Sequence, residues 1–547
     1  MARQEATPAT PSTTKPEKQG GAHPAGIGER QDVGRDADQI ERSLAAISSD
    51  KFGYREARHL LWRAGFGGTD DQIRRLVSWG PEKSVDTLLN FGDGATTPAF
   101  EPPQADTFNK DIMRPPTEEE RKMYREAQRS QNEDELARIR KLRQDAEQAD
   151  RRQMNEVQKW WLRRMVETRS PMEEKLTLFW HGHFATSYRT IENSYHMYLQ
   201  NQTLRKHAAG SFADMLGAII KDPAMIAYLD NNDSRKDRPN ENLAREIMEL
   251  FSLGVGNYGE GDIKAGAKAL TGYTFVDDEF QFQARNHDTS EKLILGEKGF
   301  WKGEDFVRII LSKKACARYV TRRLYHFFVA DVPPDERGGD KNLPGPQRAV
   351  LKELGDMLYS KGYQLRPVLR RLLLSRHFYD DAIVNQQIKS PVVLAVGAVR
   401  TLNTPVRDLS ILNDALDLMG QRIFFPPSVK GWDGGRAWIN TSTFFVRQNL
   451  LSFLLTGKKP QGYDATADIQ KFDAFALLDS APADSGVSRR EPSAVARHLL
   501  RLTVGQEPDL AVETLVSYLT RENNVVDQRT VTGMLLLITA MPEYQMC

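Results

Sequence analysis

The sequence predicts a mainly α-helical protein, a large assembly of many helices with one small β-hairpin or meander near residues 273–295. Apolar residues recur at helical spacing through most of the chain, for example in REARHLLWRAGFGG at 55–68. Short alternating stretches such as YTFV and EFQFQ surround Asp277 and Asp278 and are typical of strands. The sequence does not repeat at a fixed period, so we do not expect a solenoid.

The composition is that of an ordinary globular protein and argues against several classes of function. Of the 547 residues, 40% are hydrophobic and 27% are charged, and 75 Lys and Arg almost balance 74 Asp and Glu. This balance argues against nucleic acid or an anionic membrane as the main partner. We expect no membrane span, because apolar runs of about 18 residues are missing. Without an apolar signal segment, and with only Cys316 and Cys547, we expect a cytoplasmic protein without a disulfide framework.

Composition divides the chain into four segments. Residues 1–50 are rich in Pro, Thr, Gly and charge, and we expect them to be disordered. Residues 51–458 would form the main helical domain, interrupted by a strongly charged helical insertion at about 117–155. This insertion is either a solvated charged helix or an arm that binds a partner. A polar linker at 459–492 would lead to C-terminal helices at 493–547 that pack on the main domain.

Start and stop signals delimit the helices of the main domain in turn. Thr69 or Asp70 can cap a helix that ends at Gly80, and SPME at 170–173 has the pattern of a capping box with proline at the first helical position. The helix NLAREIMELFSL ends at Gly254. From these signals and from periodicity we expect helices at about 54–64, 70–80, 171–183, 191–207, 212–229, 241–253, 261–271, 304–330, 350–360 and 365–375, with more between 388 and 457.

The tripeptide His181-Gly182-His183 is the first candidate site, because histidine is a common metal ligand. If the helix continues through it, however, residues two apart point about 200° away from each other. Both rings could then bind one divalent metal only if the helix broke at Gly182. Three interpretations remain open: a metal pair, one functional and one structural histidine, or two structural imidazoles.

The helix after Pro239 carries a dense group of charged residues. Its apolar side chains fill one arc, and the opposite arc holds Glu241, Arg245, Glu246 and Glu249. Glu241, Arg245 and Glu249 follow at i, i+4 and i+8, so the guanidinium could lie between two carboxylates. This face is either a solvated surface with ion pairs or an acidic cleft wall whose carboxylates act as acids, bases or metal ligands.

Two further motifs complete the candidate site. His287 next to Asp288 could be a base, a ligand or a pair that closes a loop. In KGWDGGRAWINTS at 430–442, aromatic and polar side chains on a glycine-rich loop suit contacts with a sugar or a peptide, unless they pack the loop on the helical body. The candidate substrate contacts are Asn240, Trp432, Arg436, Trp438 and Asn440.

Taken together, these segments resemble a bacterial family known as domain of unknown function 1800. The resemblance runs from about Tyr54 to the final PEYQMC. Its landmarks are HLLWRAGFG, EKLTLFWHGHF, DPAMIAYLDNN, RPNENLAREIMELFSLGVGNYGEGDI, ALTGYTF, the His287-Asp288 pair, KSPVVLAVGAVR and GWDGGRAWINTSTFFVRQN. The resemblance implies that the polar landmarks act together, that members are often exported, and that a phosphatase- or sulfatase-like protein encoded nearby is a partner. This chain departs from the family in its lack of a visible signal and in the insertion at 117–155.

We therefore expect an enzyme with a cleft of His, Glu and Arg side chains between the HGH helix, the helix after Pro239 and the His287 loop. Its reaction would be a metal-assisted or acid–base hydrolysis or transfer on a polymeric or glycan-like substrate. A divalent metal would be held by His181 and His183. The expected catalytic residues are Glu241, Arg245, Glu246, Glu249, His287 and Asp288. The alternative is a non-enzymatic helical scaffold that binds a partner protein or a polysaccharide through the insertion and the Trp432 loop.

Overall fold

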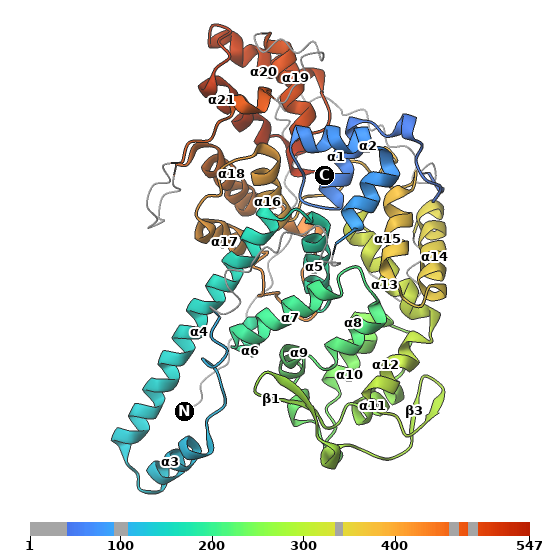
Figure 1. Ribbon diagram of the computed structural model, residues 1–547, viewed down its shortest axis with the longest axis vertical. Coiled ribbons are helices and arrows are strands. Elements are labelled where there is room, and N and C mark those ends of the chain that lie inside the picture. The colour runs from blue at the N-terminus through green and yellow to red at the C-terminus, as the bar shows by residue number, and fades with distance from the viewer. Residues whose placement is uncertain (1–40, 92–107, 334–342, 459–469, 480–490) are drawn as a thin grey trace, which may run out of the picture.

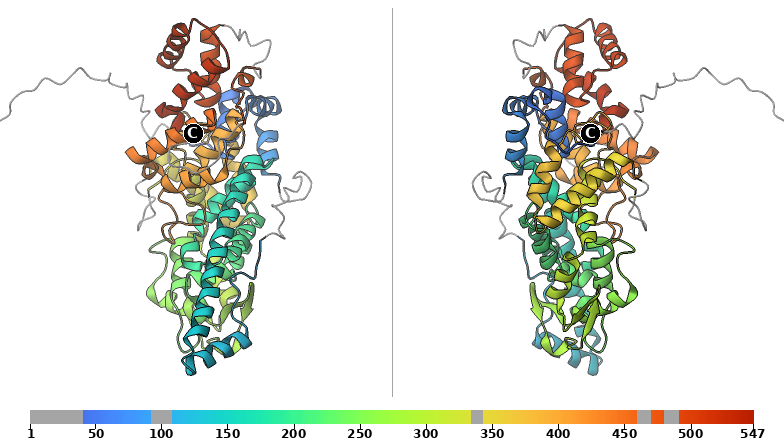
Figure 2. Two further views of the ribbon diagram at one scale, coloured as in Figure 1. Left: turned by 90° about the vertical axis from the view of Figure 1, so that its left-hand side faces the viewer. Right: turned by 90° about the vertical axis from the view of Figure 1, so that its right-hand side faces the viewer.

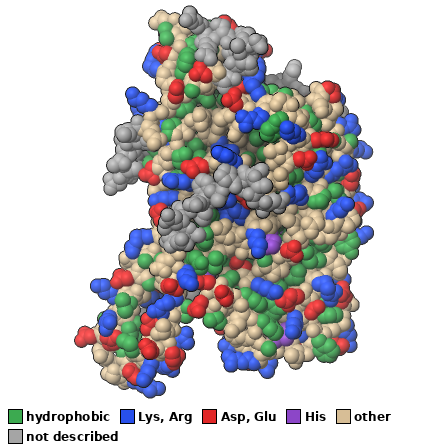
Figure 3. All heavy atoms as spheres, viewed as in Figure 1, with side chains coloured by type: hydrophobic (Ala, Val, Ile, Leu, Met, Phe, Trp, Pro, Cys, Tyr) green, Lys and Arg blue, Asp and Glu red, His purple; other side chains and the backbone are tan. Residues whose placement is uncertain are grey.

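The computed structural model describes residues 41–91, 108–333, 343–458, 470–479 and 491–547. Helices make up most of this part of the chain, so the predicted mainly α class is confirmed (Figure 1). The molecule is elongated, with the last helices at one end and the tip of a helical hairpin at the other (Figures 1 and 2). Among the described residues, no helix is both long and apolar enough to cross a membrane. Charges of both signs are mixed over the face shown in Figure 3, in keeping with the balanced composition.

The N-terminal region is ordered earlier than expected. Residues 1–50 are predicted to be disordered, yet Leu44 and Ile47 are buried. The backbone N–H of Ile47 also donates to the carbonyl of Leu374 at 2.8 Å. The rest of that prediction, and most of the predicted linker at 459–492, lies outside the described residues.

The first two helices pack against each other. They are α1 (Tyr54–Arg63) and α2 (Asp70–Leu89), and Thr69 caps α2 through its hydroxyl as predicted. The predicted end of the second helix at Gly80 is instead a kink. Gly80 has a φ of 75°, after which Pro81 restarts the helix.

The charged insertion forms a helical hairpin that projects from the body. Helix α3 (Glu118–Arg129) packs against the first part of α4 (Glu133–Glu167), and the hairpin stands away from the other helices in Figure 1. In α3 only Ala127 is buried, and the surface of the hairpin carries exposed ion pairs. The last turns of α4 are anchored in the body by the buried side chains of Trp160 and Trp161. The insertion is thus a solvated, charged hairpin with one anchored end.

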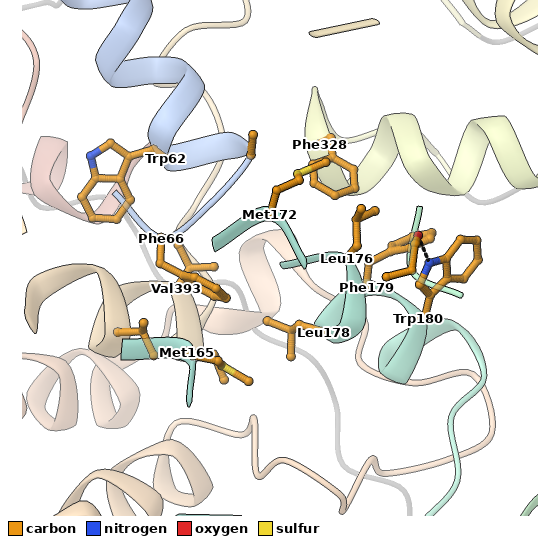
Figure 4. Packing of buried hydrophobic residues seen from close by; sticks show 14 of the residues in the cluster. Trp62, Phe66, Met165, Met172, Leu176, Leu178, Phe179, Trp180, Phe328 and Val393 are labelled. Carbon is orange, nitrogen blue, oxygen red and sulfur yellow. Dashed lines mark hydrogen bonds between the residues drawn. The ribbon is translucent and has the colours of Figure 1, made fainter. Parts of the chain in front are cut away.

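Helix α5 (Pro171–His183) runs through the centre of the body. All its residues except Gly182 are buried, and Figure 4 shows its side chains among apolar groups from several other helices. The predicted capping box at its start is wrong, because the Ser170 hydroxyl makes no capping hydrogen bond. The carboxylate of Glu173 instead accepts a hydrogen bond from Arg164 of α4 at 3.2 Å.

The elements after α5 are mostly short, and of these α7 (Ser194–Lys206) packs against α5. The helix predicted over 212–229 is in fact two helices, because Pro223 begins a new helix that Asp222 caps. These elements are α6 (Tyr188–Ile191), α7 (Ser194–Lys206), α8 (Phe212–Ile219), α9 (Pro223–Tyr228), α10 (Asn242–Glu246), the π-helix η5 (Ile247–Ser252) and α11 (Glu260–Ala269).

The predicted β region is present as two small antiparallel hairpins. β1 (Tyr273–Val276) pairs with β2 (Glu279–Phe282), and β3 (Lys292–Ile294) pairs with β4 (Glu297–Gly299). The first hairpin turns at Asp277, which adopts a φ of 53°. These hairpins lie at the end of the body away from the last helices (Figure 1).

The second half of the chain is again helical, and its last residues return to the centre. Its helices are α12 (Gly303–Leu311), α13 (Lys314–Phe328), α14 (Gly345–Ser360), α15 (Leu365–Leu374), α16 (Pro391–Leu402), α17 (Leu409–Leu418), α18 (Thr441–Thr456), α19 (Pro492–Thr503), α20 (Asp509–Arg521) and α21 (Gln528–Thr539). After α21, the N–H of Cys547 donates to the carbonyl of Gln387 at 2.9 Å. The residues after α21 therefore lie beside the segment that leads into α16.

A buried ionic network joins α5 to two neighbouring helices. Glu174 of α5 is fully buried and accepts two hydrogen bonds from Arg205 of α7, at 2.9 and 3.0 Å. Arg164 of α4 also donates to this carboxylate, as does the indole N–H of Trp161 at 2.9 Å. Burial alone would raise the pKa of Glu174, but Arg205 and Arg164 together hold it below its ordinary value. The network therefore keeps a charged carboxylate in the core.

Replacing this carboxylate by an amide should strongly destabilise the protein. We expect Glu174→Gln to lower the free energy of unfolding by about 3–5 kcal/mol, because Arg164 and Arg205 then remain buried without their counter-charge. Urea unfolding measures the loss. The matched control is Glu147→Gln, which removes an exposed ion pair with Arg143 and should change stability by less than about 1 kcal/mol. Equal losses in the two variants would contradict the assignment.

Candidate functional site

A cavity of about 900 Å³ lies beside α5, where segments far apart in the sequence meet. Its walls are one face of α5, one face of α13, the π-helix η5, residues 387–393 and the loop at 429–438. Both predicted glycine-loop tryptophans, Trp432 and Trp438, lie in this wall. The cavity is therefore the candidate functional site.

One face of α5 forms a long wall of the cavity. Lys175, Leu178, Phe179 and Gly182 follow at i, i+3, i+4 and i+7, and all four line it. Lys175 and Gly182 are seven residues apart, which is about 10 Å along the helix axis. This face thus extends from the cationic side chain of Lys175 at one end of the cavity to Gly182 at the other.

The loop at 429–438 passes very close to the far end of α5. A Cβ built at Gly431 would lie 2.3 Å from the carbonyl oxygen of Gly182, and Gly431 has a φ of 80°. Both observations require glycine at this position. The ring of Trp432 follows directly and packs beside Gly182.

A face of α13 supplies the opposite wall. Tyr319, Arg322, Arg323, His326 and Phe327 recur at helical spacing and all line the cavity. Sequence reasoning missed His326, although this row of polar residues within a helical stretch was a usable signal. The Nδ1 atom of His326 accepts a hydrogen bond from the N–H of Val332 at 3.2 Å, so the neutral ring carries its proton on Nε2.

His326 lies next to a carboxylate and next to the glycine loop. Its Nδ1 is 4.0 Å from Asp331 Oδ1. Burial lowers the pKa of His326, and Asp331 opposes that shift. Gly434 and Gly435 both have positive φ angles, and a Cβ at Gly434 would lie 4.0 Å from His326 Nε2. The loop backbone therefore approaches this histidine without an intervening side chain.

The π-helix η5 places Glu249 in the cavity wall. Such wide helical turns are rare and occur frequently at functional sites. Two carbonyls of this turn are satisfied from the other walls: His183 Nε2 donates to Phe251 at 2.9 Å, and the Tyr319 hydroxyl donates to Leu250 at 2.7 Å. Glu249 itself accepts a hydrogen bond from Tyr258 through Oε2 at 2.6 Å, so Oε1 remains available.

The end of the cavity near α1 is positively charged, and Lys175 is one of its cations. Its Nζ donates to the carbonyls of Trp62 and Gly65 at 3.2 and 2.8 Å. These carbonyls belong to the C-terminal end of α1, where the helix dipole favours a cation. Even so, burial lowers the pKa of Lys175 to about 7.

Arg63 and Lys389 stand at the same end. Lys389 Nζ donates to the carbonyl of Tyr544 at 2.6 Å, and burial lowers its pKa strongly. Arg63 donates to two backbone carbonyls and, at 3.6 Å, to the Cys547 sulfur. Burial would raise the pKa of the Cys547 thiol, but Arg63, Lys175 and Lys389 outweigh that effect and lower it. Sequence reasoning did not select Arg63, Lys175, Lys389 or Cys547 as site residues.

Comparison with known proteins now places the chain in a family. A family model described as "Protein of unknown function (DUF1800)" matches residues 59–546. The chain belongs to this family. No curated protein and no solved structure matches it. The family match spans every wall of the cavity except Cys547.

In this family member the two HGH histidines lie on different sides of α5. His183 lines the cavity, but its Nε2 is used by the π-helix. His181 does not line it; its Nε2 accepts a hydrogen bond from the N–H of Phe424 at 3.0 Å. Burial lowers the pKa of each ring to about 3. Across the described residues, no three or more His, Cys, Asp and Glu side chains are grouped so that they could hold a metal ion. The predicted metal pair is therefore not assembled.

Most of the predicted acidic face lies outside the cavity. Arg245 pairs with Glu241 at 3.0 Å and with Glu260 of α11 at 2.9 Å, not with Glu249 as the i+4 spacing suggested. The transition from α10 to the wider π-helix changes the direction of Glu249, which alone of this group reaches the cavity. Glu246 is half-buried, and burial raises its pKa.

The predicted pair His287 and Asp288 closes a loop outside the cavity. His287 Nδ1 lies 2.9 Å from the carbonyl of Thr271, and the N–H of Asp288 donates to the Thr271 hydroxyl at 2.8 Å. The Asp288 carboxylate lies 3.7 Å from the buried ammonium of Lys292. This arrangement is that of a loop closure.

Only some of the predicted substrate contacts lie in the cavity wall. Trp432 and Trp438 line the cavity, whereas Arg436 does not. Asn440 caps α18 by accepting a hydrogen bond from the N–H of Thr443 at 2.9 Å. Asn240 donates to the carbonyl of Asp230 at 2.9 Å and stabilises its own loop.

The close approach of the loop to α5 predicts the effect of a single methyl group. Gly431→Ala should destabilise the protein more than Gly420→Ala, by about 1–3 kcal/mol, because its methyl meets the Gly182 carbonyl. Gly420 is a matched control, since its φ of 85° imposes the same backbone strain with open space around it. Thermal unfolding of both variants measures the difference. Equal stabilities would show that the loop does not rest on α5.

Proposed function

We propose that this protein is an enzyme that performs acid–base hydrolysis or group transfer on a glycan-like or polymeric substrate in the cavity. The observation that carries the proposal is the presence of Glu249, the His326–Asp331 pair and the Trp432–Trp438 loop around one cavity. Acid–base groups supply chemistry, and tryptophan faces on a glycine-rich loop supply a surface for sugar rings. The metal-assisted form of the hypothesis has less support, because the candidate ligands do not converge.

In this proposal, the two titratable groups have different roles. One carboxylate oxygen of Glu249 accepts a hydrogen bond from the Tyr258 hydroxyl, and the other is the oxygen that would take part in the reaction. In the proposed reaction it accepts the proton of an attacking water or hydroxyl, whose oxygen forms the new bond, and returns that proton to the leaving oxygen. His326 donates from Nε2 to the oxygen on which negative charge develops, because its Nδ1 is already engaged by Val332.

The alternative function is a non-enzymatic scaffold, and the projecting α3–α4 hairpin is the feature that favours it. Met123, Tyr124 and Leu142 expose apolar surface there. No described contact identifies a partner for this surface, whereas the cavity combines several chemical groups. We therefore rank the enzyme first.

The setting of the protein is also part of the proposal. We propose a cytoplasmic location and a phosphatase- or sulfatase-like partner protein. The cysteines Cys316 and Cys547 are free and buried, which is compatible with a reducing compartment.

Glutamine variants of the two titratable groups test the enzyme proposal. Release of reducing ends from a panel of plant, algal and bacterial polysaccharides serves as the assay. On any substrate that is cleaved, we expect Glu249→Gln and His326→Gln to lower kcat by about 100-fold or more, because each removes a proton-transfer or charge-stabilising group.

The matched control is Glu260→Gln, because Glu260 lies outside the cavity and is 68% exposed. This variant should keep at least half of the activity. Full activity in both cavity variants would overturn the assignment. Binding of a polysaccharide without cleavage of any member of the panel would favour the scaffold instead.

A further inference from the structure

Three cationic side chains at one end of the cavity are buried and pair with no Asp or Glu side chain in the described part of the chain. Arg63 is 1% exposed, Lys175 is 4% exposed and Lys389 is fully buried. None of the three forms an ion pair with an Asp or Glu side chain of the described residues. Burial of a charge without a partner is strongly unfavourable. Among the described residues, no Asp or Glu side chain therefore balances the charge at this end of the cavity.

Buried cations elsewhere in the described core are satisfied either by a carboxylate or, as for Arg58 and Arg447, by carbonyl oxygens. The buried ammonium of Lys292 has the carboxylate of Asp288 at 3.7 Å, and the buried guanidinium of Arg205 has Glu174 at 2.9 Å. At the cavity end, the Cys547 thiol interacts with all three cations.

The two lysines also retain unused hydrogen-bond donors. An ammonium has three N–H groups. Lys175 donates two of them to the carbonyls of Trp62 and Gly65, and Lys389 donates one to that of Tyr544. Both lysines are among the residues that line the cavity, and the Lys389 ammonium also lies over the rings of Trp62 and Tyr544, at 3.9 and 4.3 Å from their centroids. Free donors and unbalanced positive charge together describe a site for a ligand that is negatively charged and accepts hydrogen bonds.

We propose that this end of the cavity binds an oxyanion of the substrate, a carboxylate, phosphate or sulfate group, between Lys175, Lys389 and Arg63. This inference rests on the proposed function, because it assumes that the cavity is the substrate site. The anion then lies about 10 Å along α5 from Gly182 and the Trp432 ring. The substrate class follows: an acidic saccharide or a phosphorylated or sulfated one, with its charged group at the α1 end and its ring near the tryptophans.

The proposal includes a definite proton linkage. Without an anion, burial and the charge of Arg63 lower the pKa of Lys175 to about 7, while Cys547 acts in the opposite direction. Burial, Arg58 and Arg447 lower the pKa of Lys389, again against Cys547. A bound oxyanion favours the protonated lysines, so binding takes up protons near neutral pH. Affinity must then fall as the pH rises above about 7.

Calorimetric titration of the full-length protein with inorganic phosphate, sulfate and glucuronate tests this site. We expect saturable binding of at least one of the three, which also identifies the class of anion. Between pH 6.5 and pH 8.5 the affinity should fall by more than about tenfold, as expected for a protonated group whose pKa is near 7. Titrations in two buffers of different ionisation enthalpy should show net proton uptake.

Two variants and a matched control assign the binding to the named residues. Lys175→Met and Lys389→Met should each weaken binding by about tenfold or more, because each removes a charge-assisted hydrogen bond. Lys292→Met removes a buried lysine outside the cavity and should leave the affinity unchanged. If a cavity variant does not fold, the proton uptake and the pH dependence of the unmodified protein still decide the question.

The two proposals fail in different ways. If none of the three anions binds, or if binding is unchanged in a folded Lys175→Met variant, the anion site is wrong, whatever the polysaccharide assay gives. Anion binding that depends on Lys175 confirms the site. If Glu249→Gln then retains full activity, only the enzyme assignment falls.

Discussion

The structure depends on how charges are satisfied on helix α5, which is almost wholly buried. Two adjacent residues of this helix carry opposite charges and have different kinds of interaction partners. Glu174 is enclosed by Arg164 and Arg205, which fixes α5 against α4 and α7. Lys175 donates to carbonyls at the end of α1, lies over the rings of Phe66 and Phe327, and lines the cavity. The paired carboxylate of Glu174 thus joins helices of the core, and the ammonium of Lys175 lies at the candidate site.

Much of the fold follows from local signals in the sequence. Helical periodicity, the cap at Thr69 and the alternating strands near Asp277 all act over a few residues, so they could be recognised without knowledge of the fold. Helical geometry also predicted that His181 and His183 would face different sides of α5, as they do. The tryptophan loop was a candidate contact surface, with packing on the helical body as the alternative, and Trp432 lines the cavity.

The remaining features arise from contacts between distant segments. The i, i+4, i+8 pattern assumed a regular α-helix, but the π-helix redirects Glu249, and Arg245 pairs instead with Glu260 on the next helix. The cationic end combines Arg63, Lys175 and Lys389, which come from α1, α5 and the segment before α16. Each has polar or charged neighbours in the sequence, so no local pattern marked the three as one group.

The central claim concerns Lys175, which is buried with no Asp or Glu counter-charge among the described residues. The most direct measurement is the free energy of unfolding of the unmodified protein and of Lys175→Met between pH 6 and pH 9, without added anions. Because the folded-state pKa of about 7 lies below the unfolded value, the unfolded chain binds more protons above pH 7, and folding stability rises with pH. Above pH 7, the free energy of unfolding of the unmodified protein should rise relative to that of Lys175→Met by roughly 1 kcal/mol per pH unit. A stability difference that stays constant over this range would contradict it.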